Sequence, residues 1–89
     1  MPRRANAWVA TAELMNVLRE RYLDKPARSV HTLADVTGVS AKTIESWARG
    51  DVSRVRFTTA DRVLTRIGAM DAWHTHPGLR KFYGSEKAA

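Results

Sequence analysis

The glycine at position 38 most constrains what this chain can fold into, because it separates two short helical patterns by a single tight turn. A residue that ends one helix and starts such a turn usually adopts a positive φ, which glycine accepts without a steric penalty. Beyond it, Ser40 is a good N-cap for a helix over 41–49, and Gly50 stands where a second left-handed residue ends that helix. The stretch from Leu33 to Gly50 therefore predicts two helices joined by a tight turn.

The apolar residues of this stretch match what two steeply crossing helices need. Ala34 is small enough for close approach, Val39 is the apolar side chain of the turn, and Leu33 lies on the core side. At 100° per residue, Ile44 and Trp47 fall on one side of the second helix. The other side of that helix carries Lys42, Glu45, Ser46 and Arg49. The second helix therefore combines a face for the core with a polar face rich in hydrogen-bond donors.

Helical spacing also appears on both sides of this pair. A stripe over 11–23 predicts a first helix with Thr11 as its cap, and Ser29 is a plausible cap for the short helix that ends at Gly38. Another stripe predicts a helix that starts near Thr58 or Thr59. Between them, Val55 and Phe57 are candidate core anchors in a linker. The apolar residues of the remainder predict one or two short helices at the edge of the core; they are Trp73, Leu79, Phe82 and Tyr83.

No segment shows sustained alternation of apolar and polar residues, so we predict an all-α fold, a compact bundle of four to five helices. The 89 residues fit one domain with a small core. We assign residues 1–8 to a flexible basic arm, 9–83 to the folded domain and 84–89 to a polar tail. Trp8, just before the first helix, is a candidate to staple the arm to the domain.

The charge balance indicates a polyanionic partner. Fifteen Lys and Arg against nine Asp and Glu give a formal net charge of +6, which favours nucleic acid first and an anionic membrane surface second. Cysteine is absent, which excludes disulfides and thiolate chemistry. No apolar run is long enough to span a membrane, and the first fifteen residues lack the apolar core of a signal peptide. We therefore expect the protein in the cytoplasm of a bacterial or phage-infected cell.

The spacing over 33–50 resembles the XRE-like helix-turn-helix family of phage repressors and Cro proteins. The matching positions are Leu33, Ala34, Gly38, Val39, Ser40, Thr43, Ile44, Trp47 and Gly50. The resemblance extends more weakly over 11–68, and "TTADRVLTRIGA" is similar to the fourth helix of such domains, particularly those of actinobacterial phages. It implies a lambda-repressor-like fold, with a central helix-turn-helix, and a transcriptional regulator that binds double-stranded DNA. Ala48 departs from the pattern, since many relatives carry glutamate there.

The resemblance also implies roles for individual residues. The helix over 41–49 would enter the major groove, with its first turn against base edges. The residues at base-reading positions would be Ala41, Lys42, Glu45 and Ser46. Residues predicted to contact phosphates are Ser29, Val30, His31, Ser40, Thr43, Arg49, Arg54 and Arg56, together with Arg3 and Arg4 in the arm. The competing interpretation of Lys42 and Arg49 is the solvated face of an amphipathic helix.

Other functional classes are weaker. His74 and His76, two residues apart, cannot share a helix face and lack the third and fourth ligands that zinc requires, so we expect no metal. No phosphate-binding loop or nucleophile elbow is present, so we expect no enzyme, no cofactor and no small-molecule ligand. Two alternatives stay open: an excision or accessory recombination factor, and an antitoxin whose segment from 69 to 83 binds a toxin. A basic membrane binder is disfavoured because the charges are spread over several helices. A homodimer on two half-sites is possible.

Overall fold

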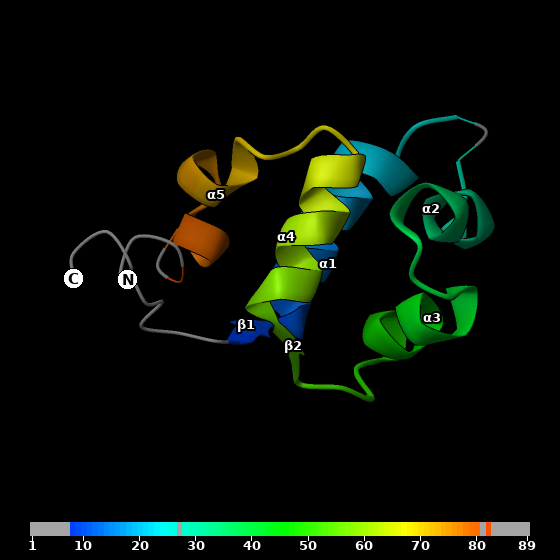
Figure 1. The fold of residues 1–89 in the computed structure, drawn as a ribbon, viewed down its shortest axis with the longest axis horizontal. Coiled ribbons are helices and arrows are strands. Elements are labelled where there is room, and N and C mark those ends of the chain that lie inside the picture. The colour runs from blue at the N-terminus through cyan, green and yellow to red at the C-terminus, as the bar shows by residue number, and fades with distance from the viewer. Residues whose placement is uncertain (1–7, 27, 81, 83–89) are drawn as a thin grey trace.

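A computed structural model describes residues 8–26, 28–80 and 82 of the chain, and their arrangement is mostly helical (Figure 1). The elements in chain order are β1 (Trp8–Ala10), α1 (Thr11–Leu18), η1 (Arg19–Leu23), α2 (Val30–Thr37), α3 (Ala41–Arg49), β2 (Arg54–Arg56), α4 (Phe57–Arg66) and α5 (Ala72–Thr75). The element η1 is a π-helical turn that continues α1. Further helical residues follow α5 at 77–80 and 82.

The helices α1 and α4 run through the middle of the molecule, with α2 and α3 on one side and α5 on the other (Figure 1). Both flanks bury side chains against the central pair. The buried apolar residues form one cluster: Val9, Leu14, Met15, Val17, Leu18, Tyr22, Leu33, Ile44, Trp47, Val55, Phe57, Ala60, Val63, Leu64, Ala69, Ala72, Trp73 and Leu79. Of the residues that the sequence placed at the core, Leu33, Ile44, Trp47, Trp73 and Leu79 lie in this cluster and Phe82 packs against it, while Tyr83 lies outside the described residues. The predicted anchors Val55 and Phe57 are buried as well.

The two helices predicted around Gly38 are confirmed. Gly38 has a φ of 79° at the end of α2, where its N–H donates to the carbonyl of Ala34. Ser40 caps α3, because its hydroxyl accepts a hydrogen bond from the Thr43 N–H at 3.2 Å. Gly50 ends α3 with a φ of 82°. Three local signals of the sequence therefore fix where α3 begins and ends.

A small sheet corrects the prediction that the chain is all-α. β1 and β2 pair as antiparallel strands, with Trp8 opposite Arg56 and Ala10 opposite Arg54. Each strand has three residues, which is too short for alternation to stand out in the sequence. Trp8 therefore belongs to the sheet and not to the predicted arm, and the linker that carries Arg54 and Arg56 is a strand.

The starts of two helices differ from the prediction in their details: the cap of α1 is another residue, and α4 begins one residue earlier. The N-cap of α1 is Ala10, and Thr11 is the first residue inside that helix, where it is buried and donates its backbone N–H to the carbonyl of Ser53 at 3.1 Å. The helix α4 begins at Phe57 instead of Thr58 or Thr59. In both cases a strand leads directly into a helix, so pairing between strands sets the boundary in place of a polar cap.

The segment after α4 folds back on the domain. Trp73 stacks on Phe57 with ring centroids 4.5 Å apart, and its indole N–H donates to an Asp61 carboxylate oxygen at 3.0 Å. On the surface, Arg21 of η1 donates two hydrogen bonds to the Asp71 carboxylate. These hydrogen bonds lower the pKa of Asp71 below its ordinary value of 3.8. The apolar contacts bury this segment, and the ion pair ties its start to the end of the first helix.

Candidate nucleic-acid interface

The four residues predicted to read bases all lie on α3, away from its buried side. Ile44 and Trp47 hold the other side of α3 in the core, with 1% and 6% of their surface exposed. Lys42 and Glu45 are exposed, whereas Ala41 and Ser46 are half-buried. Because the buried pair fixes the rotation of the helix about its axis, the polar residues have a defined direction outward.

A shallow hollow of about 300 Å³ lies on this polar side. Its lining residues are Lys42, Thr43, Ser46, Arg49 and Val52. Two predicted base readers and two predicted phosphate contacts are therefore neighbours on one surface. Ala41 and Glu45 are on the same helix but do not line the hollow. We call the surface made by Ala41, Lys42, Thr43, Glu45, Ser46 and Arg49 the α3 face.

The N-terminus of α2 holds a second group of predicted phosphate contacts. Ser29 accepts a hydrogen bond from the Thr32 N–H, and Thr32 in turn accepts one from the Ser29 N–H, so the two residues form a capping box. Val30 and His31 occupy the first turn, where backbone N–H groups have no carbonyl within the helix to bond. Such an N-terminus attracts anions.

Three more predicted phosphate contacts have side chains that already form contacts within the protein. The Ser40 and Thr43 hydroxyls lie 2.8 Å apart in the cap of α3. Arg49 forms an ion pair with Asp51, since its Nε and Nη2 lie 3.0 and 2.9 Å from the same carboxylate oxygen. Both partners of that pair are more than half exposed. A phosphate at Arg49 would therefore compete with the carboxylate of Asp51.

Arg54 and Arg56, the remaining two predicted phosphate contacts within the described residues, lie on β2 and share one aromatic partner. The guanidinium carbons of Arg54 and Arg56 lie 5.0 and 5.2 Å from the centre of the Trp8 ring. Nothing in the sequence indicates that Trp8 contacts these arginines, because they lie more than forty positions apart in the chain. Only the pairing of the strands brings them together. We call Trp8, Arg54 and Arg56 the sheet patch.

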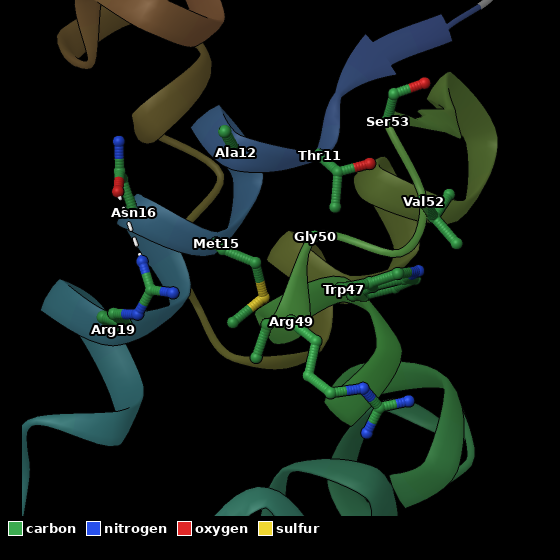
Figure 2. A pocket seen from close by; sticks show the side chains of 11 residues that line it. Thr11, Ala12, Met15, Asn16, Arg19, Trp47, Arg49, Gly50, Val52 and Ser53 are labelled. Carbon is green, nitrogen blue, oxygen red and sulfur yellow. Dashed lines mark hydrogen bonds between the residues drawn. The ribbon is translucent and has the colours of Figure 1, made fainter.

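A groove of about 380 Å³ connects the C-terminal end of α3 with the first helix. Met15, Trp47 and Val52 give it apolar walls, Arg19 and Arg49 lie at its rim, and it ends at Thr11 and Ser53 (Figure 2). Ser53 directly precedes Arg54, and Val52 also lines the hollow on the α3 face. The groove therefore adjoins both the α3 face and the strand that carries the sheet patch.

Two predicted phosphate contacts, Arg3 and Arg4, lie outside the described residues. Over the residues that the structure does describe, no three His, Cys, Asp or Glu side chains gather where they could hold a metal ion. None of the helices in that part of the chain is long and apolar enough to cross a membrane.

Comparisons with protein-family models, with curated proteins and with solved structures give no match to this chain.

Proposed function

We propose that this protein binds double-stranded DNA at specific sequences and acts as a transcriptional regulator of the repressor or Cro type. The observation that carries the proposal is the geometry of α2, its turn and α3. A nine-residue helix, capped at both ends, is anchored by Ile44 and Trp47 and directs its polar face outward. An α-helix of this kind fits the major groove of B-form DNA. We therefore propose that α2 and α3 form a helix-turn-helix in a lambda-repressor-like domain.

The α3 face supplies the chemistry for reading bases. The Lys42 ammonium donates to guanine O6 or N7, the Ala41 methyl group contacts a thymine methyl, and the Glu45 carboxylate accepts from a cytosine amino group. Ser46 has a hydroxyl that either donates or accepts, so its contribution to discrimination is weaker. A face with donors, acceptors and a methyl group distinguishes base pairs, which a purely cationic face does not.

The phosphate contacts that we propose surround this face. The first turn of α2, at Ser29, Val30 and His31, offers backbone N–H groups to one phosphate. Ser40, Thr43 and Arg49 contact the backbone beside α3, where Arg49 exchanges the Asp51 carboxylate for a phosphate oxygen. Arg54 and Arg56 add positive charge on β2. These contacts set the register of α3 in the groove and account for most of the salt dependence of binding.

The burial of most apolar side chains after α4 favours this function over the antitoxin alternative. A toxin-binding strip would have to be apolar and free, whereas Ala69, Ala72, Trp73 and Leu79 are each at most 1% exposed. An excision or accessory recombination factor uses the same domain to mark or bend DNA, so it stays as the alternative within the DNA-binding class.

The experiment that tests the proposal is selection of bound sequences from a random duplex pool at physiological salt. We expect a preferred sequence to emerge. Lys42→Ala should relax the preference at one or two base pairs and weaken binding to the preferred sequence about ten-fold, in line with the removal of one specific hydrogen bond to a base. Lys25→Ala is the matched control, because Lys25 is an exposed lysine in the turn before α2.

Two results would count against the proposal. If Lys42→Ala kept both preference and affinity, α3 would not be the reading helix. If the wild-type chain enriched no sequence while it still bound duplex DNA, the protein would be an architectural or accessory DNA binder. Arg49→Ala should instead weaken all sequences alike and flatten the salt dependence.

A further inference from the structure

The three residues of the sheet patch lie on the outer face of the two strands, where packing of the core does not require them. Successive residues of a strand point to opposite faces, so Val9 and Val55 lie inward, 0% and 5% exposed, while Trp8, Arg54 and Arg56 lie on the outer face. Trp8 is 38% exposed. Tryptophan is highly buried on average, and it is enriched at interfaces because it combines an apolar ring with a polar N–H.

The register explains how both guanidinium groups reach one ring. Arg56 lies directly opposite Trp8, and Arg54 lies diagonally across, opposite Ala10. Diagonal neighbours in an antiparallel pair are within reach of long and aromatic side chains. Because Ala10 is small, Arg54 has room to extend over the indole, 5.0 Å from the ring centre. The indole therefore has two guanidinium groups against it at the surface.

Neither guanidinium of the sheet patch has an acidic partner among the residues that the structure describes. The ion pairs in that part of the chain are those of Arg21 with Asp71 and Arg49 with Asp51. Two like charges held at one ring repel each other, and an anion that contacts them offsets that repulsion. Guanidinium groups that are fixed in this way are well suited to phosphate oxygens, which they contact in a planar and bidentate manner.

We propose that the sheet patch is a preformed second contact with the DNA backbone, and that Trp8 is the positioning residue that holds Arg54 and Arg56 ready for it. The proposal rests on the proposed function, which already assigns Arg54 and Arg56 to the DNA backbone, and adds to it Trp8 as the residue that positions both of them. The groove in Figure 2 supports DNA as the partner, because two consecutive lining residues link the α3 face to the sheet: Val52 also lines the hollow on the α3 face, and Ser53 directly precedes Arg54. A duplex seated on α3 would therefore have its flanking backbone near β2.

The first test measures affinity of the full chain for its selected duplex over a range of salt concentrations. The double variant Arg54→Ala with Arg56→Ala should reduce the slope of log affinity against log salt by nearly two, about 0.9 for each phosphate that the protein no longer neutralises. Trp8→Leu should reduce the slope by part of that amount, and Trp8→Phe, which keeps an aromatic ring, should restore most of it. Arg62→Ala with Arg66→Ala is the matched control, since both arginines are exposed and lie on α4, outside the sheet patch.

The second test uses the fluorescence of Trp8. Trp47 and Trp73 are only 6% and 1% exposed, so acrylamide should quench Trp8 before the other two. Addition of duplex should protect wild-type fluorescence from acrylamide, and Trp8→Phe should remove the protectable fraction. A purely structural role for Trp8 would leave the degree of quenching unchanged by DNA.

The outcomes separate this proposal from the proposed function. A wild-type salt slope in the Arg54 and Arg56 double variant, or an equal reduction in the α4 control, would overturn the sheet patch while sequence selection by α3 stands. Absence of any duplex binding would overturn both proposals. Binding of the wild type to phosphatidylserine vesicles that depends on Trp8, with an unchanged slope on DNA, would assign the patch to a membrane surface and overturn it as a DNA contact.

Discussion

The α3 face and the sheet patch are both exposed and both carry cations, yet their chemistry differs. The α3 face sets Lys42 and Arg49 beside the acids Glu45 and Asp51, so donors and acceptors alternate on it. The sheet patch has two guanidinium groups over one indole and, among the described residues, no acid paired with them. Mixed polar groups discriminate between base edges, whereas paired cations attract any phosphate backbone. The difference suggests that α3 supplies specificity and the sheet supplies affinity.

The two surfaces are also held in place differently. α3 depends on buried side chains and on caps at both ends, so its direction is set by the core. The sheet patch depends on strands of three residues and on contacts between side chains at the surface. Damage to the core should therefore abolish both surfaces, while damage to the patch should leave α3 intact.

The largest effect on stability should come from Trp47, the buried anchor of α3, and it is best compared with the same substitution at Trp8 of the sheet patch. Trp47→Ala removes a buried anchor of α3, and we expect it to lower the free energy of unfolding by about 3–5 kcal/mol. Trp8→Ala removes an exposed ring and should cost less than about 1 kcal/mol, the scale of exposed cation–π contacts. Urea denaturation followed by circular dichroism measures both. Equal decreases in stability would mean that the sheet patch is part of the core and not a separate surface.

A smaller effect should come from the cap of α3. Ser40→Ala removes the hydroxyl that accepts from the Thr43 N–H, and removal of such an N-cap costs about 1 kcal/mol of stability. Ser53→Ala is the control, because Ser53 is an exposed serine outside any helix. We expect Ser40→Ala to lower the melting temperature and to weaken sequence-specific binding, while the salt slope due to the sheet patch stays the same. A melting temperature equal to that of Ser53→Ala would show that the cap does not stabilise α3.

Prediction from the sequence succeeded where local signals act within one helix. Gly38, Ser40 and Gly50 set the limits of α3 by their own φ preference or hydroxyl chemistry, and the structure confirms each of them. Ile44 and Trp47 were predicted to be buried from helical spacing alone, and they are. These features depend on residues a few positions apart, so the sequence displays them directly.

The same reasoning failed where the cause is a contact between distant segments. Trp8 and Arg56 lie opposite each other because β1 and β2 pair, and strands this short leave no periodic signal. Thr11 was predicted to be a cap, but the carbonyl of Ser53 binds its backbone N–H in the folded chain. Pairing across the chain therefore limits what the sequence reveals about this interface.

The ion pair of Arg49 offers a way to make the α3 face resemble the sheet patch. Asp51→Asn removes the acid that pairs with Arg49, so the guanidinium becomes free for phosphate. We expect binding to unselected duplex to tighten about two- to five-fold at low salt, the scale of a surface ion pair, with less discrimination against unselected sequence. Asp24→Asn, an exposed aspartate in the turn after η1, is the control. Weaker binding in Asp51→Asn would show that the carboxylate positions Arg49 instead of competing for it.

The smallest effect should come from an ion pair that belongs to neither surface. Arg21 holds the pKa of Asp71 below 3.8, so the pair stabilises the fold when the pH is well above that value and stops doing so as the pH falls through the lowered pKa. Asp71→Asn keeps the shape of the side chain and removes its charge, so its melting temperature should lie slightly below that of the wild type at neutral pH. The difference should shrink below pH 3.8, because the wild-type carboxyl group then becomes protonated as well. Thermal melts of both proteins between neutral and acidic pH measure this difference, and a difference that stays constant with pH would show that the charge contributes nothing.

Since α5 lies across the central helices from α3 (Figure 1), duplex affinity at neutral pH should be the same in the wild type and in Asp71→Asn. That result would separate the stability of the flank from the binding chemistry of the two basic surfaces.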